Sequence, residues 1–201
     1  MSKKIEKYLN QYQGELLENV LPFWMKNAKD TEGGYFTCLT REGEVFDTDK
    51  FVWLQGRKTW FFAMLYNNLE HKQEWLDFAE HGADFLKKHA RPDDGTWYFS
   101  LTREGKPLIQ PYNIFSDCFA TQAFGQLYKA TGNEEYAEIA RTTFESILER
   151  RNNPKRDWSK AVEGTRPLKN FALPMILCNL SLEIEHLLPP SRKNRDFVPQ
   201  Q

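Results

Sequence analysis

The chain has 201 residues, of which 40% are hydrophobic, 14% aromatic and 27% charged, and this composition excludes disordered, collagen-like and fibrous proteins. Its 27 lysines and arginines nearly balance 28 aspartates and glutamates without a basic block, which argues against nucleic-acid binding. No apolar run approaches the roughly 20 residues of a membrane span, so we expect a cytoplasmic protein that does not bind membranes. Three widely spaced cysteines, Cys38, Cys118 and Cys178, indicate reduced core thiols and no metal site.

Apolar spacing along the chain predicts six helices of two kinds. Three stretches carry apolar residues at i, i+3, i+4 and i+7 with charges between them, which is typical of outer helices with one solvated face: residues 5–28, 71–90 and 133–151. Three others are apolar on most sides and are expected to be buried inner helices: residues 50–68, 113–130 and 168–188. Inner and outer helices therefore alternate.

A repeat with an offset of 62 residues organises these helices. The pentapeptide Leu39-Thr40-Arg41-Glu42-Gly43 recurs as Leu101-Thr102-Arg103-Glu104-Gly105, and further identities follow on both sides at the same offset. Each copy ends a short aromatic and β-branched run, at 34–39 and 96–101, with glycine at an expected left-handed position. These runs predict two β-hairpins on one rim.

Three helix pairs with hairpins on one rim predict an all-α fold, an arc of an α/α toroid over residues 1–188, followed by a polar tail at 189–201. Repeat folds bury their core by stacking neighbouring units, and an arc leaves two ends uncovered. We therefore expect self-association, for example as a homodimer.

The stretch from Gly33 through Arg57, ending in Trp53-Leu54-Gln55-Gly56-Arg57, resembles the N-acylglucosamine 2-epimerase family, and the segment 169–175 is similar too. The resemblance runs from about Gly33 to Leu188 and implies an (α/α)6 barrel, of which three helix pairs are half. It implies an isomerase that interconverts N-acetylglucosamine and N-acetylmannosamine by removing and returning the proton at C2, without a required cofactor. The expected ligand is thus a small amino sugar.

This reaction needs two proton-transfer groups and a cation that stabilises the enediolate. Arg57 suits the last role, because guanidinium stays protonated and cannot act as a base. Asp117 stands one repeat after Gln55, and both are expected to face the inner side of the toroid. The resemblance and the repeat suggest that Asp117, Asn170 and Trp53 position the substrate. Structural alternatives exist for each: helix capping for Asp117 and Asn170, and core packing for Trp53.

The alternative for Arg57 is an ion pair with Asp49 or Asp47. The family match makes the functional interpretation of Arg57 the favoured one.

The proton-transfer groups are harder to place. The four histidines lie outside the matched motifs: His71, His81, His89 and His186. The first three fall on or beside the polar outer helix, where they are expected to be solvated. In the family, the catalytic histidines come from the second half of the barrel. Some related disaccharide epimerases have a histidine where this chain has Pro174, which favours an N-acylated sugar.

The segment 150–155 resembles a loop proposed in this family to bind ATP as an activator, and it assigns Asn153 and Lys155 to effector binding. Basic residues are also favoured at any helix C-terminus, and this structural interpretation is preferred on sequence alone. For the chain as a whole, the alternative to an epimerase half is a truncated, non-catalytic product that binds sugar or protein. A glycosidase or lyase gains no support, because no matched carboxylate pair is present.

Overall fold

The computed structural model describes residues 2–111, 113–152 and 171–189. The helical elements are α1 (Lys3–Gly14), η1 (Glu15–Val20), α2 (Leu21–Asn27), α3 (Val52–Asn68), α4 (Gln73–His89), α5 (Phe115–Thr131), α6 (Glu134–Glu149), α7 (Ala172–Glu183) and η2 (Glu185–Leu187). The strands are β1 (Cys38–Leu39), β2 (Val45–Asp47), β3 (Lys50–Phe51), β4 (Ser100–Leu101) and β5 (Pro107–Ile109). Each of the six predicted helical stretches contains an observed helix, and α1, η1 and α2 follow one another without a break.

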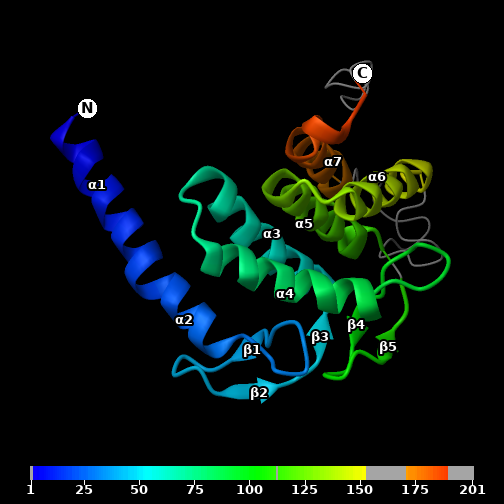
Figure 1. The fold of residues 1–201 in the computed structure, drawn as a ribbon, viewed down its shortest axis with the longest axis horizontal. Helices are drawn as coiled ribbons and strands as arrows, with labels where there is room; N and C mark the ends of the chain where they lie inside the picture. The colour runs from blue at the N-terminus through cyan, green and yellow to red at the C-terminus, as the bar shows by residue number, and fades with distance from the viewer. Residues whose placement is uncertain (1, 112, 153–170, 190–201) are drawn as a thin grey trace, which may run out of the picture.

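The inner helices α3, α5 and α7 lie side by side and run in the same direction. Near the start of α3, a Cβ added to Gly56 would lie 2.9 Å from the carbonyl carbon of Phe119 in α5. Near its end, the Asn67 amide donates to Gln126 of α5 at 2.8 Å, and Gln126 donates to Glu183 of α7 at 2.9 Å. All three inner helices therefore begin at one end of the molecule, and the helix pairs follow one another around an arc (Figure 1).

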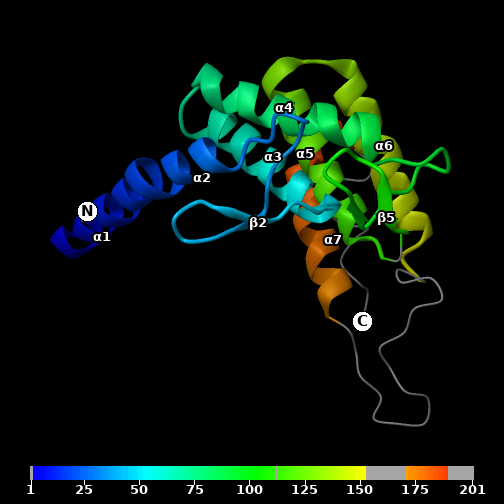
Figure 2. The same ribbon diagram turned by 90° about the horizontal axis from the view of Figure 1, so that it is seen from below.

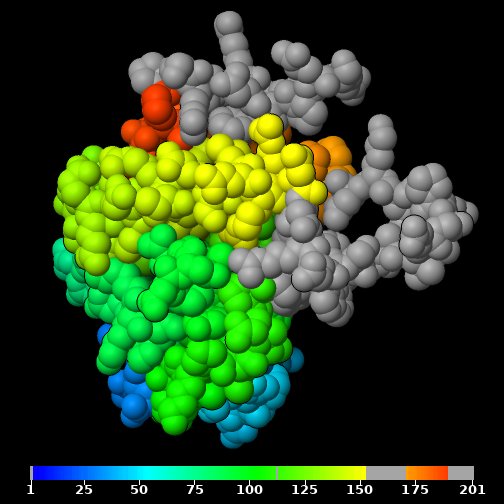
Figure 3. Space-filling model, turned by 90° about the vertical axis from the view of Figure 1, so that its right-hand side faces the viewer, coloured from blue at the N-terminus to red at the C-terminus, as the bar shows by residue number. Residues whose placement is uncertain are grey.

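The outer helices α4 and α6 cover the outer side of the inner helices, as predicted. Figure 2 shows the arc from below, and the space-filling view in Figure 3 shows α6 beside the green segment that includes the second hairpin. Helix α4 buries one face, which carries the apolar positions of the sequence pattern: Trp75, Leu76, Phe78, Ala79, Gly82, Ala83, Phe85 and Leu86. Helix α5 has neighbours on most sides and is buried continuously from Ser116 to Leu127.

The 62-residue repeat is reproduced in the backbone hydrogen bonds. The Phe36 N–H donates to the carbonyl of Ala28 at 2.7 Å, and the Tyr98 N–H donates to that of Ala90 at 3.0 Å. Both repeated pentapeptides form tight turns, in which the glycine has a left-handed backbone, with φ of 95° at residue 43 and 89° at residue 105. The predicted hairpins are confirmed as β1–β2 and β4–β5, and β4 also pairs with β3, the strand that leads into α3.

The two turns differ in what their arginines contact. The Arg103 guanidinium lies 2.9 Å from Asp30 in the first repeat, and the same carboxylate accepts the Lys50 ammonium at 2.9 Å. Asp30 and Lys50 are both fully buried, and the Lys50 ammonium also donates to the Arg103 carbonyl at 2.8 Å. The counterpart of Arg103 in the first turn, Arg41, is exposed and forms no ion pair within the described ranges. This Asp30–Lys50–Arg103 cluster joins the two repeats.

The N-terminal helix differs from the expectation of a packed outer helix. Helix α1 extends away from the arc (Figure 1) and buries no residue. Its apolar positions Ile5, Tyr8, Leu9 and Tyr12 are exposed, so its amphipathic face has no covering partner among the described residues. Within the same residues, no helix has both the length and the apolar character needed to cross a bilayer.

Candidate functional site

Arg57 lies on the inner face of the arc, in the second turn of α3. Its guanidinium carbon lies 4.6 Å from the ring centre of Phe119 in α5 and 5.6 Å from that of Trp53, one turn earlier in α3. Aromatic faces attract a cation without neutralising it, so the Arg57 N–H groups remain available to an anion. The arrangement is a cation held by two rings near the end of the arc where the inner helices begin.

The structural alternative for Arg57 is not observed. Arg57 is exposed, and the described residues give it no carboxylate partner. Asp47 instead accepts the Asp49 backbone N–H at 2.8 Å within its own loop. An exposed guanidinium with no carboxylate partner among the described residues suits the binding of an anionic or hydroxyl-rich ligand.

The structure does not bring Asp117 to this cluster. Successive residues in a helix are about 100° apart, so Asp117 points away from the direction of Phe119, which contacts Arg57. The Asp117 carboxylate is fully buried and pairs with the Arg150 guanidinium at the end of α6. The side chain of its repeat counterpart, Gln55, also points away from the inner face. The expectation that Asp117 faces the inner surface is therefore corrected, because its side chain ties α5 to an outer helix.

Gln55 is turned toward the first hairpin loop. Its side-chain amide exchanges two hydrogen bonds of 2.8 Å with the backbone N–H and carbonyl of Tyr35. Gln55 and Asp117 thus occupy positions that hold the arc together, whereas Arg57 and Phe119, two residues farther along each helix, face inward.

Deeper on the inner face, a polar network connects all three inner helices. The carboxylate of Glu183 in α7 accepts the Trp60 indole N–H of α3 at 3.0 Å and the Gln126 amide of α5 at 2.9 Å. One turn nearer the rim, Gln122 of α5 donates to Asn179 of α7. The network orders the inner surface below Arg57 and provides hydrogen-bonding groups for a polar ligand.

The four histidines make their contacts elsewhere. The His81 ring lies between α4 and the first loop, with Nε2 3.0 Å from the Asp30 carbonyl and 2.9 Å from that of Gly34. His186 Nε2 lies 3.1 Å from the Gly125 carbonyl, and burial lowers the pKa of both rings. His81 is therefore half-buried and bonded to the backbone, where solvation was expected, and neither ring adjoins Arg57.

His71 stacks on Tyr66, with ring centres 4.8 Å apart, and His89 packs against Phe85 at 5.0 Å.

Three of the predicted site residues, Asn170, Asn153 and Lys155, lie outside the described residues. The adjoining arginine of the proposed effector loop, Arg150, is described, and it is held by Asp117 and by Ser146. Its charge is thus already paired within the fold.

The family model described as N-acylglucosamine 2-epimerase matches residues 34–187. The chain belongs to this family. The N-acylglucosamine 2-epimerase of Rattus norvegicus is 39% identical over 176 residues, which are 85% of this chain and 42% of the relative. The cellobiose 2-epimerase of Eubacterium cellulosolvens is 30% identical over 161 residues, which are 79% of this chain and 40% of the relative.

Solved structures confirm the fold of this chain. A cellobiose 2-epimerase from Bacillus thermoamylovorans matches with a TM-score of 0.77 at 21% identity, over 90% of this chain and 51% of the solved one. A sugar epimerase from a ruminal bacterium matches with a TM-score of 0.67 at 27% identity, over 88% and 47%. The fold is part of an (α/α)6 barrel, and the chain spans less than half the length of the curated relatives it matches.

Two features of the site were missed by sequence reasoning. Phe119 stands one repeat after Arg57, so applying the 62-residue offset to Arg57 would have found it. Lys58, the residue after Arg57 in α3, extends toward α2, and its ammonium is 4.1 Å from the ring centre of Trp24. Burial lowers the pKa of Lys58 to about 7. No local sequence signal separates this lysine from an ordinary solvated one.

Proposed function

We propose that this chain is the substrate-positioning part of a sugar 2-epimerase that interconverts N-acetylglucosamine and N-acetylmannosamine. The observation that carries the proposal is the exposed Arg57 guanidinium between Trp53 and Phe119 on the inner face of a chain from this family. The relatives that this chain matches, N-acylglucosamine and cellobiose 2-epimerases, support the reaction class.

In the proposed reaction, the open-chain sugar lies along the inner face with its carbonyl oxygen toward Arg57. Removal of the C2 proton moves negative charge onto that oxygen, and a fixed guanidinium stabilises this charge more than it stabilises the neutral aldehyde. Trp53 offers a ring against the sugar, and Asn170 is proposed to orient a hydroxyl group. The proton-transfer groups are assigned to the part of the barrel that lies outside this chain, because all four histidines are engaged elsewhere.

The role of ATP is proposed as that of an activator, with Asn153 and Lys155 as its contacts. The engagement of Arg150 by Asp117 leaves Arg151 and Lys155 as the cations for the phosphates. The cytoplasmic location is also a proposal, and the three free thiols support it.

Two measurements on the 201-residue chain test the assignment. Saturation-transfer NMR should detect N-acetylglucosamine binding, and Arg57→Met should weaken it at least tenfold, whereas Arg141→Met on the outer helix α6 should not. Proton NMR in deuterated water should show no exchange at C2. Exchange by this chain would overturn its positioning role, and equal binding by Arg57→Met would overturn the site.

A hybrid distinguishes the epimerase half from a non-catalytic product of the family. When the chain is extended with the helix pairs of the rat relative that follow the matched part, C2 exchange should appear with ATP present. A hybrid that binds the sugar without exchanging its proton would favour the non-catalytic alternative.

A further inference from the structure

Glu183 is a half-buried carboxylate on the inner face of α7. Its Oε2 atom accepts two hydrogen bonds, one from the Trp60 indole at 3.0 Å and one from the Gln126 side-chain amide at 2.9 Å. These are the only hydrogen bonds that its side chain makes with described residues, and none of the ion pairs among those residues includes it. Charged groups that leave water are normally paired or fully hydrogen-bonded. The Oε1 atom of Glu183 therefore remains available to a hydrogen-bond donor from a ligand.

The two donors fix the position of this carboxylate. Trp60 belongs to α3 and Gln126 to α5, so two neighbouring helices hold Glu183 in place. Gln126 is itself held, because its side-chain oxygen accepts the Asn67 amide at 2.8 Å. An acceptor that is fixed in this way needs little rearrangement when a ligand binds, and such preorganisation favours one ligand over its analogues.

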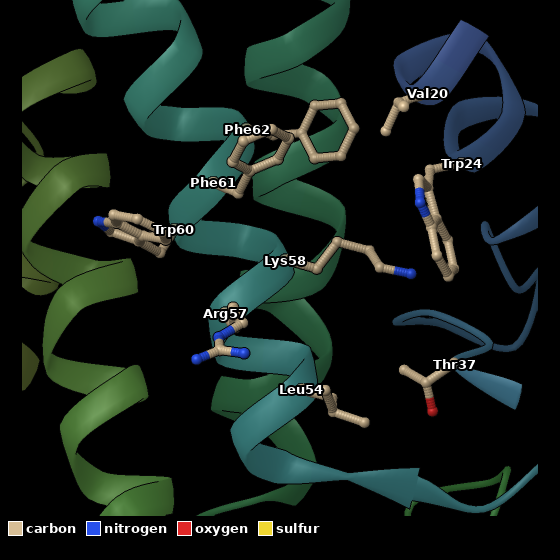
Figure 4. Close-up of a pocket in the computed structure, with 9 residues that line it drawn as sticks. All are labelled: Val20, Trp24, Thr37, Leu54, Arg57, Lys58, Trp60, Phe61 and Phe62. Carbon is tan, nitrogen blue, oxygen red and sulfur yellow. The ribbon is translucent and has the colours of Figure 1, made fainter. Parts of the chain in front are cut away.

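Arg57 and Glu183 border the same side of the arc at different depths, counted from the rim where the inner helices begin. In Figure 4, Arg57 and Trp60 project from α3 toward the same side, whereas Lys58 extends toward Trp24. Trp60 follows Arg57 by three residues, which places it about 4.5 Å deeper along the helix. Because the Trp60 indole binds Glu183, the carboxylate lies deeper on the inner face than the guanidinium.

Helix α5 gives an upper limit for this depth. Phe119 contacts the Arg57 guanidinium. Gln126, which donates to Glu183, follows Phe119 by seven residues, and these correspond to about 10 Å along an α-helix. The guanidinium and the carboxylate are thus separated along the inner face by between about 4.5 and about 10 Å. The five C–C bonds of an open six-carbon sugar span about 6 Å, which lies within these limits.

There is also room beside the carboxylate. Glu183 lines a cavity of about 560 Å³, together with Met64 of α3 and Gln126 of α5. The same cavity extends to Asn68 at the end of α3 and to Lys129 near the end of α5. The carboxylate therefore borders open space of the size that the end group of a sugar needs.

We propose that Glu183 is a specificity-determining residue that accepts a hydrogen bond from the C6 hydroxyl group of the sugar whose C1 oxygen lies at Arg57. This inference rests on the proposed function, which places that oxygen at the guanidinium. A carboxylate is a stronger acceptor for a hydroxyl group than a neutral oxygen is. A sugar without this hydroxyl group takes the carboxylate out of water and offers it no donor in return. Glu183 thus selects sugars by the end that is remote from the reacting carbon.

Deoxy sugars test this contact in the unmodified chain. Ligand-observed NMR titrations of the 201-residue chain compare N-acetylglucosamine with its 6-deoxy and 4-deoxy analogues. Loss of the C6 hydroxyl group should weaken binding about tenfold or more, as expected for a hydrogen bond to a charged group. Loss of the C4 hydroxyl group should weaken binding less than about threefold, because no charged partner is assigned to it.

A variant tests the residue itself. Glu183→Gln keeps an oxygen that can accept from Trp60 and Gln126 but removes the charge, so it should bind N-acetylglucosamine about tenfold more weakly. In this variant, loss of the C6 hydroxyl group should cost less than about threefold in affinity. Glu185→Gln, the same change two residues later, should bind all three sugars as the unmodified chain does. Far-UV circular dichroism checks that both variants fold.

Equal binding of the 6-deoxy sugar by the unmodified chain, or a loss confined to the 4-deoxy sugar, would overturn the proposal without any variant. An undiminished effect of the C6 hydroxyl group in a folded Glu183→Gln variant would overturn it as well. The proposed function fails separately: if N-acetylglucosamine does not bind, or binds equally to Arg57→Met, both proposals are wrong. If it binds through Arg57 without any dependence on its C6 hydroxyl group, only this inference is wrong.

Discussion

Replacing Asp30 with asparagine should destabilise the fold by about 3 to 5 kcal/mol, because it leaves a buried lysine without its carboxylate. The Lys50 ammonium is fully buried and lies 2.9 Å from Asp30. Its other partners in the cluster are backbone carbonyls, including that of Arg103 at 2.8 Å. Removing one charge of such a pair costs more than the pair itself contributes, since the remaining charge stays out of water.

The double variant Asp30→Asn/Lys50→Met measures the coupling between the two groups. Both buried charges are then absent, so its loss of stability should be smaller than the sum of the two single losses. We expect a coupling free energy of about 2 kcal/mol or more. Urea denaturation followed by tryptophan fluorescence and circular dichroism gives each free energy of unfolding, and coincident transitions verify two-state behaviour.

The same cluster makes the free energy of unfolding of the unmodified chain fall at acidic pH. Burial raises the pKa of Asp30, but hydrogen bonds from Arg103 and Lys50 lower it by more than burial raises it. The pKa of Asp30 is therefore below its usual value. The folded state therefore binds this proton less readily than the unfolded state. The contribution is present above about pH 4 and is lost as the pH falls through the lowered pKa.

Asp30→Asn should flatten the stability profile in that acidic range. Additive single variants, with a coupling below about 0.5 kcal/mol, would refute the reasoning, because they would show that the two charges do not depend on each other.

Two further predictions concern α3. Lys58→Met should stabilise the chain at pH 7 by about 2 to 4 kcal/mol. Burial lowers the pKa of Lys58 to about 7, so the folded state binds its proton less readily than the unfolded state does, and the charged lysine costs stability. Contact between the ammonium and the Trp24 ring offsets part of the cost of burying this charge. The advantage should shrink as the pH rises toward 10, and a pH-independent difference in urea unfolding would contradict it. Gly56→Ala should lower the free energy of unfolding by about 1 to 3 kcal/mol, because the new Cβ would meet the Phe119 backbone. In the same assay, Gly14→Ala should be neutral or slightly stabilising, because the space around Gly14 in α1 is open.

The arrangement of elements could be predicted because three signals agreed. Apolar periodicity located the helices, the repeated pentapeptide located both hairpins, and apolar character on most sides separated the three inner helices from the outer ones. Helix α1 shows the limit of the first signal. Its amphipathic pattern predicts a helix with a face to bury, but the pattern does not say which element covers that face.

The candidate site was only partly predictable, and helical phase is the reason. Arg57 was found through a motif, and its placement on the inner face follows from contacts with Trp53 and Phe119. Asp117 was inferred from its repeat counterpart Gln55, and the equivalence is correct. The error was in the face assigned to both, since a two-residue step along a helix nearly reverses the direction of a side chain. Sequence spacing alone does not fix that phase.

Cysteine placement shows the same limit. Cys118 is buried in the core as expected, but Cys178 is exposed on the uncovered face of α7. The residues around it in the sequence are mostly apolar, which suggested a core position. In an arc, an apolar helix face is buried only if the next unit is present.

The Asp30–Lys50–Arg103 cluster also has a consequence for the order of events during synthesis. Lys50 leaves the ribosome 53 residues ahead of Arg103, and Asp30 leads it by 73. At 5 to 20 residues per second, roughly 3 to 10 s pass between the emergence of Lys50 and that of the turn that completes its environment. During that interval the first loop lacks the ion pair between Asp30 and Arg103. The nascent chain therefore cannot finish its first repeat on its own and completes it only when the second one arrives.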